Sequence, residues 1–263
     1  MKRLYLTELK GSLVRARTVL AILLTACCIL VDSIDLAPRM FEKNSPMDAH
    51  YFWFHSITYA GIYGKYFIAV LAAAVFAGDF CRQYRQGIWR YVIARMGVYS
   101  YTLEKYVCCF LSGGLTAAGA GFLYLVTAGS YVPLFNRARY IEIEFLPYAH
   151  ILDEYPVLYF GIGLYLLFLS GGFWACTGYT LSVYLPLNYS VYAAPFLFIF
   201  VLTRMYNIFG ISDDWRLDYW LCGRSAPLKN EESLLVITIA VLGLCCIFGK
   251  IFSWKLSRRL EYE

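Results

Sequence analysis

The sequence predicts an all-α integral membrane protein that forms a single domain over residues 1–263. Apolar side chains make up 60% of the chain and charged ones only 16%, a balance that would leave a water-soluble domain of this size with large exposed apolar patches. Two long segments, 106–136 and 155–203, carry no charge at all. Neither segment alternates apolar and polar residues, which excludes the short alternating strands of a membrane β-barrel.

Six transmembrane helices are predicted, because a hydrocarbon core about 30 Å thick requires roughly 20 apolar residues of helix. The predicted spans are residues 18–36, 56–77, 106–128, 157–181, 188–206 and 233–253. The uncharged segment 155–203 holds two of them, because polar or helix-breaking residues interrupt it at Ser182, Pro186 and Asn188. Small faces for close helix contact are expected at Gly113, Gly114, Gly119, Gly121, Gly161, Gly163, Gly171 and Gly172.

The distribution of charge predicts that both termini lie in the cytoplasm. Short cytoplasmic loops carry an excess of Lys and Arg, and this N-in, C-in topology places twice as many basic residues inside as outside. The outer segments, about 37–55, 129–156 and 207–232, are instead rich in Asp and Glu. Residues 1–17 combine apolar residues at helical spacing with Lys and Arg, which indicates an amphipathic helix on the inner membrane surface or a plain extension of the first span.

The basic segment 81–106 separates the second and third predicted spans. Within residues 81–99 the apolar and aromatic side chains fall largely on one helical face, so we expect a cytoplasmic helix. Glycine weakens a helix by about 1 kcal/mol relative to Ala, and breaks are therefore expected at Gly87 and Gly97. Basic residues alone are enough to set the membrane topology. The apolar face of this helix therefore indicates that the helix docks against another surface. The alternative is an interfacial helix whose Arg residues contact anionic lipid and whose Trp and Tyr residues hold it at the interface.

The residues around this segment carry a family resemblance. Asp79 closes the second span, Gly87 follows a short basic stretch, and Lys105 opens the third span. In this order they resemble the first intracellular loop of ABC-2 type permeases. The six predicted spans and the basic N-terminal segment are also similar to those of this family, so the resemblance extends over the whole chain. The chain departs from the family pattern at Ile88, where many relatives have Thr, and at residues 98–100, which lack the Ser-Arg pair of many relatives.

The resemblance implies the membrane-spanning subunit of a bacterial ATP-binding cassette exporter in the plasma membrane. ATP and Mg would bind a separate dimeric ATPase subunit, and a second permease chain, identical or homologous, would complete the transporter. The partners implied are these proteins and membrane lipid, with no nucleic acid. The coupling helix that contacts the ATPase would consist of Gln86, Gly87, Ile88, Trp89, Arg90, Tyr91 and Arg95.

Lys65 lies midway in the second predicted span, where a charge costs about 3 kcal/mol. It either contacts an anionic part of a cargo on the translocation path, pairs with Asp32 or Asp35, or snorkels to the interface. The spans show no constellation of acid, base and nucleophile, and no phosphate-binding loop. We therefore expect no catalytic, cofactor or metal site in this chain. The remaining alternatives are a membrane scaffold or immunity protein and, less favoured, an intramembrane enzyme.

Overall fold

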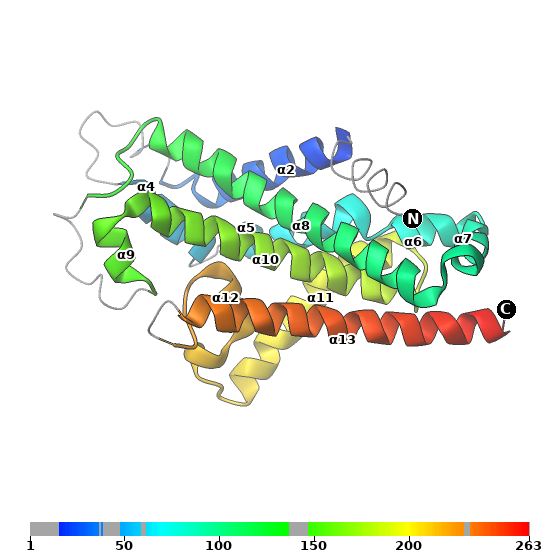
Figure 1. Ribbon diagram of the computed structural model, residues 1–263. Coiled ribbons are helices and arrows are strands. Elements are labelled where there is room, and N and C mark those ends of the chain that lie inside the picture. Colours follow the sequence, from blue (N-terminus) through cyan, green and yellow to red (C-terminus); the bar gives the residue numbers. More distant parts are fainter. Residues whose placement is uncertain are drawn as a thin grey trace.

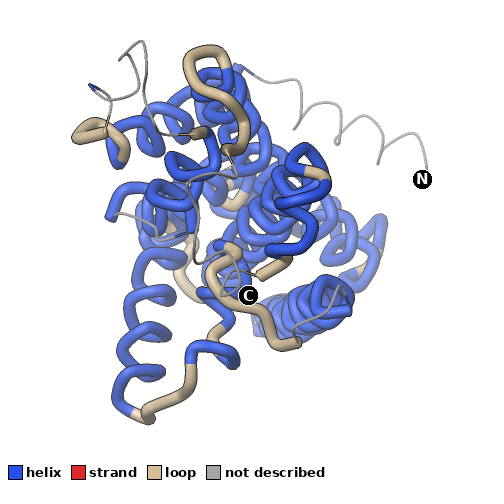
Figure 2. The backbone as a smooth tube through the Cα atoms, turned by 90° about the vertical axis from the view of Figure 1, so that its left-hand side faces the viewer, coloured by secondary structure: helices blue, strands red, loops and turns tan. Residues whose placement is uncertain are grey.

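The computed structural model describes residues 16–36, 38, 48–58, 62–136, 147–228 and 232–262, and every regular element in these ranges is a helix (Figures 1 and 2). The elements are α2 (Ala16–Asp32), α4 (Ala49–Trp53), the π-helix η1 (Phe54–Thr58), α5 (Ile62–Phe76), α6 (Asp79–Arg85), α7 (Ile88–Met96), α8 (Val98–Gly129), α9 (Ala149–Glu154), α10 (Pro156–Ser182), α11 (Asn188–Ile208), the 3-10 helix η4 (Asp213–Trp215), α12 (Leu217–Cys222) and α13 (Glu232–Tyr262). The predicted all-α class is confirmed. The amphipathic helix predicted before the first span lies outside the described residues, apart from the first two residues of α2.

Within the described ranges, four helices are long and apolar enough to cross a membrane, namely α8, α10, α11 and α13. The pair α5 and α6 makes a fifth span if its two parts, bent by 41°, cross as one. Helix α2 has 17 residues, which is about 25 Å of helix and the lower limit for a hydrocarbon core. These long apolar helices indicate a multi-pass membrane protein, and the last four predicted spans lie inside the four long helices.

The second predicted span, 56–77, is less regular than the sequence suggests. Its first residues belong to η1, and the α-helix begins only at Ile62. At the other end the helix bends at Gly78, where a Cβ atom would lie 2.8 Å from the Tyr192 hydroxyl of α11. The missing side chain leaves room for the Tyr192 hydroxyl beside the backbone at the bend.

The long helices lie side by side, and the chain reverses direction from one to the next (Figure 1). The beginning of α8 lies beside the C-terminal halves of α10 and α13. The Tyr106 hydroxyl of α8 is 2.8 Å from Thr180 Oγ1 of α10 and donates a hydrogen bond to the Phe248 carbonyl of α13 at 3.0 Å. Helices α2 and α11 begin at the same end, since Arg17 and Asn188 line one small cavity beside α6. The loops that join α5 to α8 and α10 to α11 therefore lie at one end of the bundle.

Helices α8 and α10 cross in close contact. The pentapeptide FLSGG occurs twice, at 110–114 and at 168–172, and the two copies meet in antiparallel orientation. A Cβ atom on Gly113 would lie 2.5 Å from Ala175 Cβ and 2.6 Å from the Gly171 carbonyl oxygen. The Phe110 and Phe168 rings, whose centroids are 5.7 Å apart, each cover the second glycine of the other copy. The expected small helix faces are thus confirmed here, and they allow direct backbone contact.

A cluster of buried hydroxyl groups joins three elements at the other end of the bundle. The Tyr124 hydroxyl of α8 is 2.7 Å from Ser33 Oγ and 3.0 Å from Ser56 Oγ, and the two serines also contact each other. Tyr124 donates a further hydrogen bond to the Phe52 carbonyl at 3.1 Å. Each polar group is thereby satisfied in an apolar surrounding, where an unpaired hydroxyl would cost on the order of 2 kcal/mol.

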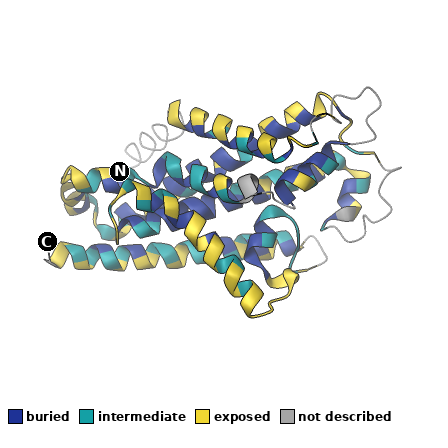
Figure 3. Cartoon of the chain, turned by 180° about the vertical axis from the view of Figure 1, so that it is seen from behind, coloured by how far each residue is buried: buried dark blue, intermediate teal, exposed yellow. Residues whose placement is uncertain are grey.

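Two helices expose most of their apolar residues, as Figure 3 shows for α2 and α11. On α2 the exposed apolar side chains include Val19, Leu20, Leu23, Leu24, Leu30 and Val31. On α11 they include Phe196, Leu197, Phe198, Phe200, Val201, Met205 and Ile208. Exposed apolar faces of this size are suited to lipid or to another apolar protein surface.

Candidate functional site at the basic end of the bundle

Basic side chains gather at the end of the bundle that carries α6, α7 and the C-terminus, at the right of Figure 1. We call this the basic end. Its described basic residues are Arg17, Arg82, Arg85, Arg90, Arg95, Lys105, Lys250, Lys255, Arg258 and Arg259. The opposite end, formed by α4, α9, η4 and α12, carries Asp48, Asp153, Glu154, Asp213, Asp214 and Asp218 together with Arg216 and Arg224. The charge asymmetry of the sequence is therefore also an asymmetry in space.

Helix α7 is a short rigid element between two glycines with positive φ. Gly87 lies between α6 and α7 with φ of 70° and ψ of 0°, and Gly97 lies between α7 and α8 with φ of 81° and ψ of 152°. The second conformation is nearly restricted to glycine. A Cβ atom at either position would meet nothing within 4 Å, so the backbone conformation alone requires glycine. The predicted breaks at Gly87 and Gly97 are confirmed.

The inner face of α7 packs on the bundle through Trp89, which is only 2% exposed. The indole stacks on the Tyr84 ring at 5.8 Å and meets the Phe80 ring edge-on at 6.3 Å. Phe80 in turn packs on Phe252 of α13 at 5.3 Å. Ile93, one turn after Trp89, is also buried. Part of the predicted apolar face is thus buried within the chain itself, where it holds α7 against α6 and α13.

The outer face of α7 is open. Six of the seven residues predicted to contact an ATPase are exposed, namely Gln86, Gly87, Ile88, Arg90, Tyr91 and Arg95. Tyr91 is 79% exposed and Ile88 46%, and the Arg90 guanidinium lies 5.4 Å from the centroid of the Trp89 ring. The surface therefore combines positive charge with one aromatic and one aliphatic side chain. Trp89, the seventh predicted residue, is buried and is not part of this surface.

Asp79 connects α6 to α8 across the base of α7. Its carboxylate accepts hydrogen bonds from Lys105 Nζ at 3.3 Å and Arg82 Nη2 at 2.5 Å. It also accepts one from Gln83 Nε2 at 2.8 Å, and Gln83 Oε1 accepts one from the Tyr101 hydroxyl at 2.9 Å. The side chains of Lys105 and Asp79 are 3% and 9% exposed, so this ion pair is shielded from solvent. The pair thereby links α6 directly to α8.

The sequence located the ends of this pair but did not predict that they meet. Asp79 and Lys105 are 26 residues apart, and the only sequence signal was an acidic residue closing one apolar segment and a basic residue opening the next. The burial of Trp89 was also missed. Its spacing of four from Ile93, both on the same side of a helix, was the available sign.

Lys65, the other predicted functional residue, lies on α5, but its side chain is outside the described part of the structure. In the described ranges, no group of three or more His, Cys, Asp or Glu side chains is placed to hold a metal ion. Of the histidines, His50 is buried and lies among the rings of Phe54, Phe135 and Tyr159.

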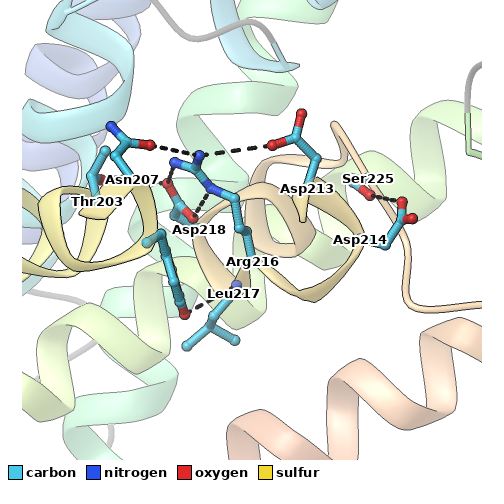
Figure 4. A network of polar contacts seen from close by, with 9 residues as sticks. Thr203, Asn207, Asp213, Asp214, Arg216, Leu217, Asp218 and Ser225 are labelled. Atoms are coloured by element: carbon cyan, nitrogen blue, oxygen red, sulfur yellow. Dashed lines mark hydrogen bonds and ion pairs between the residues drawn. The ribbon is translucent and has the colours of Figure 1, made fainter. Parts of the chain in front are cut away.

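A second polar network closes the opposite end of the bundle (Figure 4). The guanidinium of Arg216 donates to both carboxylate oxygens of Asp218 at 3.4 and 3.3 Å, and to Asn207 Oδ1 of α11 at 3.1 Å. It also stacks on the Tyr219 ring at 3.9 Å. Burial alone would lower the pKa of Arg216, but the hydrogen bonds and charge of Asp218 raise this pKa overall. The pair therefore stays ionised and joins the end of α11 to α12.

Helix α12 reaches into the bundle beside this network. Trp220 and Leu221 are buried in one apolar cluster with Ala69 of α5, Leu166 of α10 and Ile237 of α13. The Trp220 indole N–H is satisfied by the Asp214 carbonyl at 2.7 Å. Segment 207–232, predicted from the sequence to lie on the outer side, contains the short helices η4 and α12. The apolar side chains of α12 fill the space between the long helices at this end.

The geometry defines a multi-pass helical membrane protein with a docked, glycine-bounded helix at its basic end. No protein-family model, no curated protein and no solved structure matches this chain. Function is therefore inferred from the residues of the two ends of the bundle.

Proposed function

We propose that the chain is the membrane-spanning subunit of an ATP-binding cassette exporter, with α7 as the helix that contacts a separate ATPase. The observation that carries the proposal is the construction of α7. It is short, bounded by two positive-φ glycines, packed on the bundle through Trp89, and open on a face that holds Arg90 and Tyr91. A rigid helix held in this way can pass a movement of a soluble motor to the membrane helices.

The Asp79 network supports the coupling step. A push on α7 acts on α6 and α8, and these two helices are linked by the shielded ion pair between Asp79 and Lys105. Helix α8 is in turn in backbone contact with α10 at the FLSGG crossing. Binding of ATP and Mg by the dimeric ATPase subunit would thus tilt α8 and α10 together, because close-packed helices move as units.

In this proposal the chain crosses a bacterial plasma membrane six times with both termini inside. The six traverses are α2, α5 with α6, α8, α10, α11 and α13. Their alternating direction supports the count, and the gathering of Arg and Lys at the basic end supports a cytoplasmic position for that end. A second permease chain, identical or homologous, would cover part of the exposed apolar faces of α2 and α11.

The opposite end would then be the outer gate. The buried side chains of α12 fill the space between α5, α10 and α13. The Arg216 guanidinium, paired with Asp218 of α12, donates to Asn207 of α11 and so holds α12 to α11. Export of a cargo requires this end to open. Displacement of α12 as a single unit would open it. The arrangement supports a resting state that is closed on the outside.

The test is co-purification from the native membrane in mild detergent, with partners identified and quantified by mass spectrometry. We expect an ATPase subunit in a fixed ratio to this chain. Arg90→Glu combined with Tyr91→Ala should remove it, because both side chains are exposed on α7. Arg258→Glu is the matched control, since Arg258 is an exposed arginine at the same end that also lies over a Trp ring, but it belongs to α13 and not to α7.

A membrane scaffold or immunity protein without ATP hydrolysis is the competing function. It is favoured by the same exposed Ile88 and Tyr91, which are also suited to a membrane interface. If no ATPase accompanies the chain, and the α7 variant instead loses affinity for anionic vesicles, the transporter proposal fails and the scaffold replaces it.

A further inference from the structure

A groove runs along the outside of the bundle between α8 and α13. It has a volume of about 530 Å³, within the roughly 300–1,000 Å³ of small-molecule sites. Both helices are long and apolar enough to cross a membrane, so the groove opens toward lipid. Most of its wall is apolar, with Leu103, Val107 and Leu111 on α8 facing Leu242 and Cys246 on α13.

Small residues on α13 keep the groove empty of protein. Cys245, Cys246 and Gly249 are among the α13 residues that line it. A Cβ atom on Gly249 would lie 3.9 Å from the Tyr106 ring, which is ordinary contact distance and leaves room for a side chain. The two helices therefore run past each other without filling the space between them, and this space is not closed by any other element that the structure describes.

The polarity of the groove changes along its length. At the basic end its lining includes Lys250, Ser253, Tyr99 and Thr102, whereas further along it is aliphatic. Lys250 is exposed, and no carboxylate in the described part of the chain is paired with it. Trp254 also lines this end and is 54% exposed, in the position that aromatic side chains take at a membrane interface. One end thus suits an anion and the rest an acyl chain.

We propose that the groove binds an anionic phospholipid from the leaflet at the basic end. Its phosphate would contact the Lys250 ammonium and the hydroxyls of Ser253 and Tyr99, and one acyl chain would lie against Val107 and Leu242. Basic pockets between membrane helices recognise such headgroups, and each Lys near the surface contributes about 1 kcal/mol. The site does not depend on an ATPase partner, so it stands or falls separately from the proposed transport function.

The test uses Trp254 as a reporter in reconstituted vesicles. The full chain is placed in phosphatidylcholine with increasing fractions of phosphatidylglycerol brominated near the top of the acyl chain, and quenching is compared with the Trp254→Phe protein to isolate this residue. We expect half-maximal quenching at a lower fraction of brominated phosphatidylglycerol than of brominated phosphatidylcholine. Lys250→Gln should reduce this preference about fivefold, which corresponds to about 1 kcal/mol.

Lys255→Gln is the matched control. Lys255 has the same charge and lies on the same helix, but its ammonium is 5.5 Å from the centroid of the Tyr184 ring, outside the groove. This variant should keep the preference. Gly249→Leu should fill the groove and reduce quenching by either lipid to the bulk level.

Three results would overturn the proposal. Equal loss in both Lys variants would mean diffuse attraction to the basic end. Equal quenching by the two lipids would mean that the groove does not select an anion. Absence of quenching by any brominated lipid would mean that protein, such as a second copy of the chain, covers the groove.

Discussion

Substitution of Gly171 by Ala tests whether the crossing of α8 and α10 depends on direct backbone contact. The added Cβ atom would lie 2.6 Å from Ala117 Cβ and still closer to the Gly113 carbonyl oxygen. Non-bonded carbon atoms are most stable at about 3.5–4.0 Å, so the two helices would have to separate by about 1 Å. Neither obstacle is the flexible end of a side chain, and the separation would extend to the rest of the crossing.

The expected cost is about 1–3 kcal/mol, the usual range for overpacking a close-packed core. Gly161→Ala is the control, because Gly161 lies on the same helix and a Cβ atom there meets nothing within 4 Å. Both variants gain about 1 kcal/mol of helix propensity, which cancels when they are compared. At about 2–4 °C per kcal/mol for a chain of this size, Gly171→Ala should melt about 2–12 °C below Gly161→Ala.

Thermal unfolding in detergent can be followed with a thiol-reactive fluorophore once accessible thiols such as Cys27 and Cys246 have been blocked, because Cys108, Cys109 and Cys176 are buried and will react only when the bundle opens. The scan rate must be the same for both proteins, since unfolding of membrane proteins in detergent is often irreversible. Equal midpoints for the two variants would refute the reasoning: the crossing would then be loose enough to accept a methyl group, and α8 and α10 would not move as one body.

Three further predictions concern buried ionisable side chains. Burial lowers the pKa of His50 to about 4 from an unfolded value of 6.5, so the unfolded state gains a proton first on acidification. Stability is therefore present above pH 6.5 and lost as the pH falls toward 4, by about 2 kcal/mol between pH 7.5 and 5; His50→Phe should flatten this dependence of the melting temperature, and an unchanged pH profile would contradict it. Asp79→Asn removes the carboxylate paired with buried Lys105 and should cost about 3 kcal/mol, part of which the second change Lys105→Met should restore; no recovery in the double variant would show that the pair itself is not the cause. Asp218→Asn removes the carboxylate that holds the Arg216 guanidinium beside Asn207 of α11 and that accepts a hydrogen bond from Thr203 of the same helix, so amide hydrogen exchange in α12 should rise about tenfold, equivalent to about 1.4 kcal/mol, while exchange in α8 stays constant.

Much of the fold could be predicted because the hydrophobicity of a segment is a local property. The predicted spans 106–128 and 157–181 lie inside α8 and α10, and helix limits differ mainly where polar residues continue a helix beyond its apolar part, as α13 does to Tyr262. The breaks at Gly87 and Gly97 were also readable, since glycine acts on its own backbone. The meeting of Gly78 with the Tyr192 hydroxyl of α11 was not, because it joins segments that are far apart in the sequence.

By itself, the sequence determined the helical membrane class, the approximate limits of the long helices and the asymmetric distribution of charge. Only the tertiary structure decided which residues meet. It brought Asp79 to Lys105, turned Trp89 inward so that the exposed face of α7 consists of its neighbours, and placed the two FLSGG copies against each other. The physical reason is that each of these contacts depends on the relative rotation and direction of two helices. Those quantities are set by packing over the whole bundle, and no single segment of sequence contains them.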